Sequence, residues 1–374
     1  MKLNNVELKR EEEAIFLLRA LFEQYGYVQY KMNKFEEYDL YVENKDFLIS
    51  DGIITFTDTN GKLMALKPDV TLSIIKNLKN RTQGVEKVYY NENVYRVSNG
   101  SHSFKEIMQA GIECMGQVDD YCLFEVVMLA AKSLAALSDD VVLDISHFGM
   151  LTDLMESFGA TSSARRKMLV AVGEKNIHEL ARICRSEGMA EEKIEILSRL
   201  VSTYGAPSKV LPQLRSLVSG LVPEESLLLL EALTDRLEAN GLGSMVRIDF
   251  SVVNDLNYYN GVVFKGFVKG IPSWILSGGQ YDRLMGKMHR KAGAVGFAVY
   301  LDLLQNLTSR SKGFDVDAIL LYDNVALSVV DQAMGDLIAQ GKSVMAQREK
   351  PEKVCYRELY QITEEGVKLL ERNA

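Results

Sequence analysis

The chain has few of the residues that mark disulfide-rich or metal-binding proteins. Its 374 residues include four cysteines, four histidines, six prolines and one tryptophan. No two cysteines form a Cys-x-x-Cys spacing, so we expect free thiols in a reducing compartment rather than a disulfide framework. The histidines form no metal-ligand spacing with one another or with the cysteines. We therefore predict neither a metal site nor a cofactor.

Long apolar runs are also missing, and so is a secretory leader. No stretch of about eighteen apolar residues is present to cross a membrane. The first residues, Met-Lys-Leu-Asn-Asn-Val-Glu-Leu-Lys-Arg-Glu-Glu-Glu, are too polar for a signal peptide. The sequence therefore predicts a cytoplasmic protein that has no membrane partner.

Positive charge is in deficit. The chain has 43 Lys and Arg against 51 Asp and Glu, a net charge of −8. Because nucleic-acid affinity depends largely on Lys and Arg that neutralise phosphates, this balance argues against a tRNA-binding protein. It does not exclude a local basic stripe. The length allows two or three domains with a large buried core.

The first 150 residues alternate between helix and strand patterns. Apolar residues recur at helical spacing near the N-terminus. Further along, Asp-Thr-Asn-Gly at 58–61 is a turn sequence between two short apolar segments. We predict helices over 6–25 and 120–137, short strands over 53–57 and 62–67, and a strand pair over 86–97 and 106–116.

Residues 151–239 are rich in Leu, Ala, Glu and Arg, and strand patterns are weak there. We predict an all-helical insertion with a turn at Gly205-Ala-Pro. Strand patterns return over 245–253, 258–268 and 273–277, and a strand that continues into a helix is predicted from Val295 to Leu304. Because the insertion interrupts one fold, residues 1–150 and 240–308 are expected to share a sheet of class α+β, mainly antiparallel and flanked by helices.

The last stretch, 314–374, is a small α/β unit. Its pattern predicts strands over 317–322 and 343–346, and helices over 327–340 and 357–372. From Ser311 onward the residues carry a surplus of acidic over basic side chains, which is a poor surface for an RNA stem.

One strand carries a notable polar face. On the predicted strand over 106–116, Gln109, Gly111 and Glu113 point to the same side. This face presents an amide, no side chain and a carboxylate, and the gap at Gly111 would let a ligand approach the backbone. The amide and carboxylate suit ammonium and imidazole N–H donors. The alternative is a polar strand edge that simply faces solvent.

The residues 254–261, Asn-Asp-Leu-Asn-Tyr-Tyr-Asn-Gly, followed by Val-Val-Phe-Lys, resemble a signature of the histidyl-tRNA synthetases. In that family it reads Arg-Gly-Leu-Asp-Tyr-Tyr-Thr-Gly-Thr-Val-Phe-Glu and holds histidine. Four other segments match family motifs in the same order. They are Leu-Lys-Pro-Asp-Val-Thr at 66–71, Tyr-Arg at 95–96, Gln-Ala-Gly-Ile-Glu at 109–113 and Ser-Gly-Gly-Gln-Tyr-Asp at 277–282. The segment from Ala294 to Leu304 resembles the third motif of the class.

The resemblance covers residues 1 to about 308 and implies a class II aminoacyl-tRNA synthetase-like sheet. It also implies a histidine-binding site, with Asp69 at the α-amino group and Arg96 near the carboxylate. Tyr259 is the better candidate of the tyrosine pair for the imidazole. Asp69 alone could equally cap a helix. The implied site residues are Asp69, Thr71, Arg96, Gln109, Glu113, Tyr258, Tyr259 and Tyr281.

The charges that an adenylate-forming enzyme needs are missing. Asn254, Ser103 and Leu303 stand where the family has arginines, and Tyr300 replaces a glycine that makes room for the nucleotide. Losing one preorganised positive group typically costs about 10²–10³ in rate. The first motif of the class is also degraded, since Asn33 replaces its dimer-interface proline.

The retained amino-acid pocket and the missing charges together resemble the ATP phosphoribosyltransferase regulatory subunits, which are paralogues of the histidyl-tRNA synthetases. The resemblance implies a non-catalytic subunit of the first step of histidine biosynthesis that activates a short-form catalytic subunit and mediates histidine feedback. It implies a homodimer within a hetero-octamer and no bound tRNA. The C-terminal unit would be a remnant of an anticodon-binding-like domain. An active histidyl-tRNA synthetase, a related amino-acid-activating ligase and a scaffold that binds no histidine remain alternatives.

Overall fold

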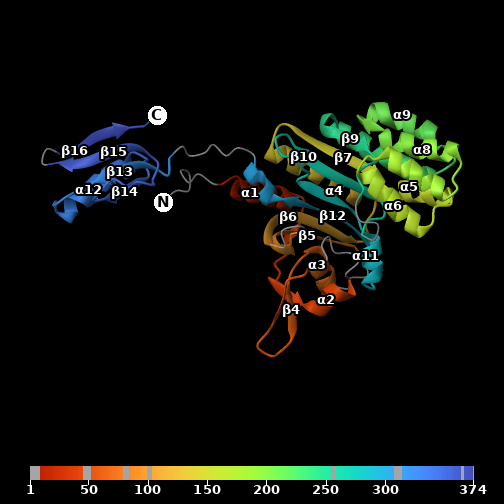
Figure 1. Cartoon of the computed structure of the whole chain (residues 1–374), viewed down its shortest axis with the longest axis horizontal. Coiled ribbons are helices and arrows are strands. Elements are labelled where there is room, and N and C mark those ends of the chain that lie inside the picture. The colour runs from red at the N-terminus through yellow and green to blue at the C-terminus, as the bar shows by residue number, and fades with distance from the viewer. Residues whose placement is uncertain are drawn as a thin grey trace. The chain divides into compact units, whose positions relative to one another are not determined.

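The computed structural model describes residues 9–44, 52–78, 84–98, 103–253, 258–306, 314–363 and 366–373. The chain forms two compact units, one spanning Arg10–Gln305 and one made mainly of the residues that follow (Figure 1). Within the described residues, no helix has the length and apolarity that a membrane crossing requires.

The larger unit is built on a nine-stranded sheet with the strand order β1-β5-β6-β12-β11-β10-β7-β9-β8. Its longest strands, β5 (Val85–Val97) and β6 (Phe104–Gly116), pair antiparallel along their whole lengths, which confirms the predicted strand pair. Only the pairs β1·β5 and β7·β9 are parallel among the described pairs of this sheet. The other strands are β1 (Val28–Gln29), β7 (Val141–His147), β8 (Tyr204–Gly205), β9 (Val246–Asp249), β10 (Val262–Val268), β11 (Leu276–Gln280) and β12 (Gly293–Tyr300).

Helix α4 (Asp120–Leu137) packs against the sheet at β7, β10 and β12, and α1 (Arg10–Gln24) packs against α4. The bounds of α4 are those predicted. Asp119 begins the helix, because its carboxylate accepts a hydrogen bond of 2.9 Å from the Cys122 amide. This bond lowers the pKa of Asp119, as expected for an ionised cap at a helix N-terminus.

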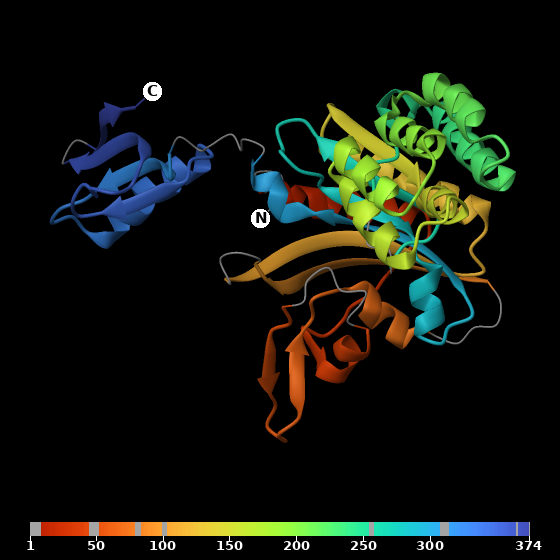
Figure 2. The same cartoon turned by 45° about the vertical axis from the view of Figure 1, so that its right-hand side comes forward.

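A smaller sheet with the order β2-β4-β3 lies in the same unit, together with two short helices (Figure 2). Its hairpin is the predicted one. Asp58 accepts bonds of 2.8 Å from the amides of Asn60 and Lys62, and Gly61 has a φ of +81° that favours glycine. These elements are β2 (Phe35–Glu37), α2 (Tyr38–Glu43), β3 (Thr55–Thr57), β4 (Leu63–Leu66) and α3 (Thr71–Asn77).

Six helices follow β7 and gather at one end of the large sheet (Figures 1 and 2). They are α5 (Phe148–Ser157), α6 (Ser162–Gly173), α7 (Ile177–Ser186), α8 (Glu191–Ser202), α9 (Pro207–Val218) and α10 (Glu224–Ala239). The predicted turn at Gly205 lies between α8 and α9, where the two-residue strand β8 also pairs with β9. The domain limits at 151 and 239 stay a prediction.

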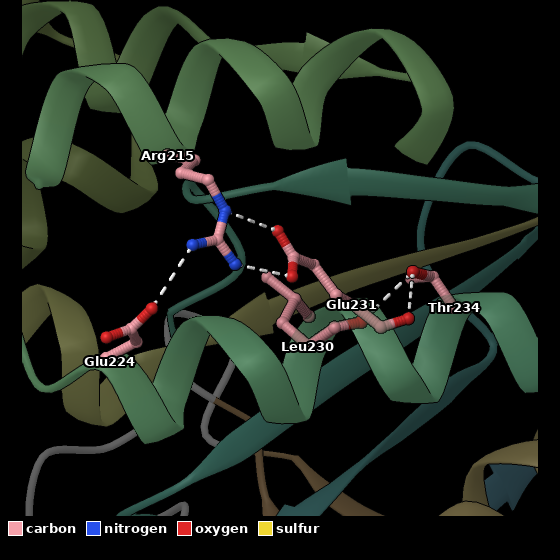
Figure 3. Close-up of polar contacts among 5 residues, drawn as sticks. All are labelled: Arg215, Glu224, Leu230, Glu231 and Thr234. Carbon is pink, nitrogen blue, oxygen red and sulfur yellow. Dashed lines mark hydrogen bonds and ion pairs between the residues drawn. The ribbon is translucent and has the colours of Figure 1, made fainter.

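An arginine fork joins the last two of these helices (Figure 3). Arg215 on α9 donates to both carboxylate oxygens of Glu231 on α10, at 3.1 and 2.7 Å, and approaches Glu224 at 3.4 Å. The planar guanidinium suits this two-point contact, which a lysine could not reproduce. The chain then returns to the sheet through the 3₁₀ helix η3 (Gly243–Met245), and later contributes α11 (Asp282–Lys287) and η4 (Leu301–Asn306).

The smaller unit has a four-stranded sheet with the order β14-β13-β15-β16 and the helix α12 (Leu327–Ala339). Strands β13 (Val316–Leu321) and β14 (Val344–Gln347) are close to the predicted ones. The predicted helix over 357–372 is wrong, because this segment forms the hairpin of β15 (Tyr356–Thr363) and β16 (Gly366–Arg372). Its Leu, Glu, Lys and Arg residues favour a helix, but pairing of β15 with β13 buries Leu359 and Ile362 and decides the outcome.

A buried carboxylate lies at the open end of this hairpin, where Glu358 is opposite Arg372. Glu358 is 6% exposed and pairs with Lys342 at 2.7 Å and with Arg372 at 2.6 Å. Hydrogen bonds from Lys342 and from the Tyr360 hydroxyl are the main causes that lower the pKa of Glu358 to about 2.

We predict that Glu358→Gln lowers the melting temperature of the protein at neutral pH. Since the folded-state pKa is below the unfolded one, the stability from Glu358 is present above about pH 4.5 and is lost as the pH falls toward 2. The melting difference between parent and variant should therefore shrink over this range in thermal scans. Glu352→Gln, at an exposed position, is the control. A difference that stays constant from pH 7 to about pH 2.5 would contradict the assignment.

Candidate functional site

The large sheet carries a cavity of about 240 Å³ on one face. Residues from β5, β6, β11, β12, the start of α3 and the segment before β10 line it. All eight residues predicted from the sequence are among the lining residues, although they come from five separate segments. They are Asp69, Thr71, Arg96, Gln109, Glu113, Tyr258, Tyr259 and Tyr281.

Strand β6 brings Gln109 and Glu113 to this face, as the two-residue period predicted. Both are buried, so the alternative of a polar edge in solvent is wrong. Opposite Glu113 in the register lies Gly296 of β12. A Cβ at Gly296 would come within 1.8 Å of Glu113 Oε2 and 2.5 Å of the Ile112 carbonyl oxygen. The absence of a side chain at this position therefore makes room for the carboxyl group.

The space beside Gly111 is used differently from what we predicted. Tyr90 of β5 pairs with Gly111, and a Cβ there would meet the Tyr90 hydroxyl at 2.5 Å and the Phe297 carbonyl oxygen at 2.3 Å. The gap that was expected to admit a ligand is thus filled by a tyrosine. Both Tyr90 and Phe297 line the cavity, so its open space begins at these two residues and not at Gly111.

Two hydroxyl groups hold the Glu113 carboxyl group. Thr71 Oγ1 donates to Oε1 at 2.6 Å, and the Tyr281 hydroxyl donates to Oε2. The residue is 3% exposed, and burial raises its pKa to about 8 against the opposing effect of the two hydroxyls. Burial therefore favours the neutral acid over the carboxylate.

The sequence left two roles open for Asp69, a helix cap and a residue of the ligand site, and the structure is consistent with both. Its Oδ1 accepts a hydrogen bond of 2.9 Å from the Leu72 amide at the start of α3, which is a capping contact. It also lines the cavity. Burial raises the pKa of Asp69, whereas the Leu72 amide and the charge of Arg96 oppose the shift.

Three tyrosines form an aromatic group at the cavity. The ring of Tyr258 lies 4.6 Å from that of Tyr259 and 5.6 Å from that of Tyr281, measured between centroids. Both adjacent tyrosines line the cavity, although consecutive residues of a strand would point to opposite faces of the sheet. The predicted strand over 258–268 begins later than expected, since β10 begins at Val262 and residues 258–261 are irregular.

Two side chains with N–H donors line the cavity, and they differ in whether a hydrogen-bond partner is present. Arg96 Nε donates to the Pro68 carbonyl at 3.0 Å, which holds the guanidinium beside the start of α3. Gln109 is 4% exposed, and its Nε2 has no hydrogen-bond partner among the described residues. A buried donor without a partner is costly, so a ligand acceptor in the cavity would relieve it.

One aromatic residue of the cavity wall, Trp274, was not predicted from the sequence. Trp274 packs edge-on against Tyr300, with ring centroids 5.0 Å apart, and both line the cavity. Their contact follows from the hairpin of β11 and β12, where the Tyr300 amide donates to the Ile275 carbonyl at 2.7 Å. The one signal in the sequence is that Trp274 is its sole tryptophan.

Of the other residues singled out from the sequence, Tyr300 lines the cavity, and the others that the structure describes lie outside its lining. Ser103 is exposed, and Leu303 lies in η4 outside the lining. Asn33 is exposed before β2, and Asn254 lies outside the described residues. No group of three or more His, Cys, Asp or Glu with metal-binding geometry was found within the described part of the chain.

Comparisons with known proteins agree with this fold. A family model described as histidyl-tRNA synthetase matches residues 2–304. A protein of Oceanobacillus iheyensis named ATP phosphoribosyltransferase regulatory subunit is 27% identical over 304 residues, or 80% of this chain and 74% of that protein.

Two solved structures are similar in fold. One from Bacillus halodurans is described as an ATP phosphoribosyltransferase regulatory subunit/histidyl-tRNA synthetase, with a TM-score of 0.76, 23% identity and coverage of 94% of this chain and 93% of that one. The other is an ATP phosphoribosyl transferase (HisG:HisZ) complex from Thermotoga maritima, with a TM-score of 0.61, 18% identity and coverage of 78% and 97%. The predicted class II synthetase-like α+β fold is confirmed.

We predict that Gly296→Ala destabilises the protein by about 1–3 kcal/mol, because overpacking would push on the Glu113 carboxyl group and the Ile112 backbone. Urea unfolding would measure this. Gly286→Ala is a matched control, since a Cβ at Gly286 meets nothing within 4 Å. Equal midpoints for the two variants would contradict the close contact between Gly296 and Glu113.

Proposed function

The chain belongs to the histidyl-tRNA synthetase family, and we propose that within this family it is a regulatory subunit of ATP phosphoribosyltransferase. The proposal rests on two observations. Several relatives at 25–27% identity carry the name ATP phosphoribosyltransferase regulatory subunit. The cavity keeps polar groups for an amino acid, whereas Tyr300 and Trp274 occupy its wall.

Histidine is the ligand that we propose for the cavity. It offers an ammonium group, a carboxylate and an imidazole ring, and the lining provides a complement for each. Asp69 suits the ammonium group and Arg96 the carboxylate. Glu113, Gln109 and the tyrosine rings suit the imidazole, which can donate, accept and stack. The volume of about 240 Å³ is adequate for a small amino acid and small for a nucleotide.

Amino-acid activation is the function that the site argues against. Adenylate formation needs positive groups directed at the α-phosphate. Among the described residues that line the cavity, Arg96 is the one Lys or Arg, and it already contacts the Pro68 carbonyl. The adenine and phosphates would also have to pass the Tyr300–Trp274 pair. The non-catalytic role predicted from the sequence is therefore retained here as a proposal.

The partner that we propose is the short-form catalytic subunit, which this chain would activate and make sensitive to histidine. A similar structure is described as a HisG:HisZ complex, which supports such a partner. A homodimer within a hetero-octamer, a chain without bound tRNA and a cytoplasmic location remain proposals, as does the remnant origin of the C-terminal unit. The net charge of −8 supports the absence of tRNA.

Substitution of Glu113 tests the ligand. We expect Glu113→Gln to weaken histidine binding by about 10- to 150-fold, because a hydrogen bond to a charged partner contributes about 1.5–3 kcal/mol. It should also relieve histidine inhibition of the assembled phosphoribosyltransferase. Glu106→Gln is the control, since Glu106 lies on the same strand and outside the cavity lining.

Two outcomes of this experiment would count against the proposal. Unchanged histidine affinity in Glu113→Gln would place the ligand elsewhere. Weakened binding with unchanged inhibition would mean that the regulatory histidine binds at another site, so that this cavity does not couple to the partner.

Pyrophosphate exchange tests the absence of catalysis. We expect no exchange with histidine and ATP in the purified chain, since the groups that would handle the nucleotide are missing. An exchange rate of even about 1 s⁻¹, which is within the ordinary enzyme range, would support an amino-acid-activating enzyme instead. An active histidyl-tRNA synthetase under the same conditions shows that the assay works.

A further inference from the structure

Among the described residues, no positively charged side chain contacts the carboxyl group of Glu113. Its oxygens accept hydrogen bonds only from the neutral hydroxyls of Thr71 and Tyr281 among the described residues. The other acidic group that acts on it is Asp69, and a negative charge there disfavours a second one on Glu113. The charge of Arg96 acts instead on Asp69 and on Tyr300.

Polar groups face Glu113 from every element that packs around it. They are Asp69 and Thr71 at the start of α3, Tyr90 on β5, Tyr258 and Tyr259 before β10, Tyr281 before α11, and Gln109 on β6 itself. None of these groups is a cation. Strand β12 contributes Gly296, which has no side chain.

An isolated carboxylate is costly to bury, and such a group takes up a proton when its only partners are neutral. The geometry of Glu113 meets this condition, since it is 3% exposed and fixed between two hydroxyls and the backbone of Gly296. A pKa of about 8 is consistent with it. A threonine hydroxyl accepts as readily as it donates, so the protonated acid keeps its hydrogen bonds.

We propose that Glu113 holds a proton while the cavity is empty and passes it to a basic ring nitrogen of the ligand. The O–H bond of the acid breaks, an N–H bond forms on the ring, and the total charge of the complex does not change. The ligand is then held as a cation beside a carboxylate. This inference rests on the proposed function, because it takes histidine as the ligand.

The surroundings favour the product of this transfer. The new ion pair has the strength of a charge-assisted hydrogen bond in a buried site. The three tyrosine rings at 4.6 and 5.6 Å from one another provide aromatic faces, which attract a cationic ring. The cavity therefore favours a ligand whose buried group is a neutral base in solution and can accept one proton.

The pH dependence of affinity separates this mechanism from binding by an ordinary carboxylate. Free imidazole titrates near pH 6.5 and Glu113 near pH 8, so between these values the complex forms without net proton exchange. Below about pH 6.5 the free ring already holds a proton, so binding must release one. Above about pH 8 neither free group holds the proton, so binding must take one up. Affinity should therefore peak between about pH 6.5 and 8 and fall by about tenfold per pH unit on either side.

Two measurements test the transfer. The first is calorimetric titration with histidine from about pH 5 to 9, in the full chain and in Glu113→Gln. The second is nuclear magnetic resonance of ring-¹⁵N-labelled histidine at about pH 7.5, where the free ring is neutral. We expect an imidazolium ring in the parent complex and a neutral ring in the variant, which should also lose the fall in affinity above pH 8.

A third measurement requires no ligand. The infrared spectrum of the empty protein at neutral pH should contain the carbonyl band of a buried carboxylic acid that is absent in Glu113→Gln and disappears when histidine is added. An empty protein without this band overturns the inference, as does a neutral ring in the parent complex or an affinity optimum below pH 6.5. Absence of histidine binding at every pH would instead overturn the proposed function together with the inference.

Discussion

The register between β6 and β12 determines where the carboxyl group of Glu113 lies, and the rest of the cavity depends on this position. Glu113 faces Gly296, and a Cβ there would come within 1.8 Å of its Oε2. The same register brings Ala298 opposite Gly111 and Tyr300 opposite Gln109. A shift by one residue would turn both polar side chains of β6 to the other face of the sheet. The long antiparallel pairing with β5 fixes β6 in place.

The cavity has a charged end, and the end that contains this carboxyl group is lined by aromatic and neutral polar side chains. Asp69 and Arg96 lie near the start of α3, where they suit the two charged groups of an amino acid. The tyrosines and Gln109 surround the end that holds Glu113. Trp274 and Tyr300 form an aromatic wall. We propose that this cavity holds an amino acid and not a triphosphate, so that a synthetase-like fold serves recognition without catalysis.

The sequence predicted much of this arrangement because its signals are local. Alternation along β6 placed Gln109 and Glu113 on one face, and the helical pattern over 120–137 predicted the bounds of α4. The assignment of histidine to the eight residues came from resemblance, and it remains a proposal. The wrong predictions concern segments whose structure depends on contacts with residues far away in the sequence. β15 and β16 contain strong helix formers, but β15 pairs with β13 and β16 pairs with β15. Tyr258 reaches the cavity because β10 begins later than the pattern suggested. The contact of Trp274 with Tyr300 needs a hairpin that no local pattern specifies.

The central claim is that this chain recognises histidine and does not activate it. Its most direct test is calorimetric titration of the purified chain with histidine and, separately, with ATP. We expect saturable binding of one histidine per chain and no measurable heat with ATP at concentrations that saturate an active histidyl-tRNA synthetase. Tight ATP binding, or an absence of histidine binding, would contradict the account.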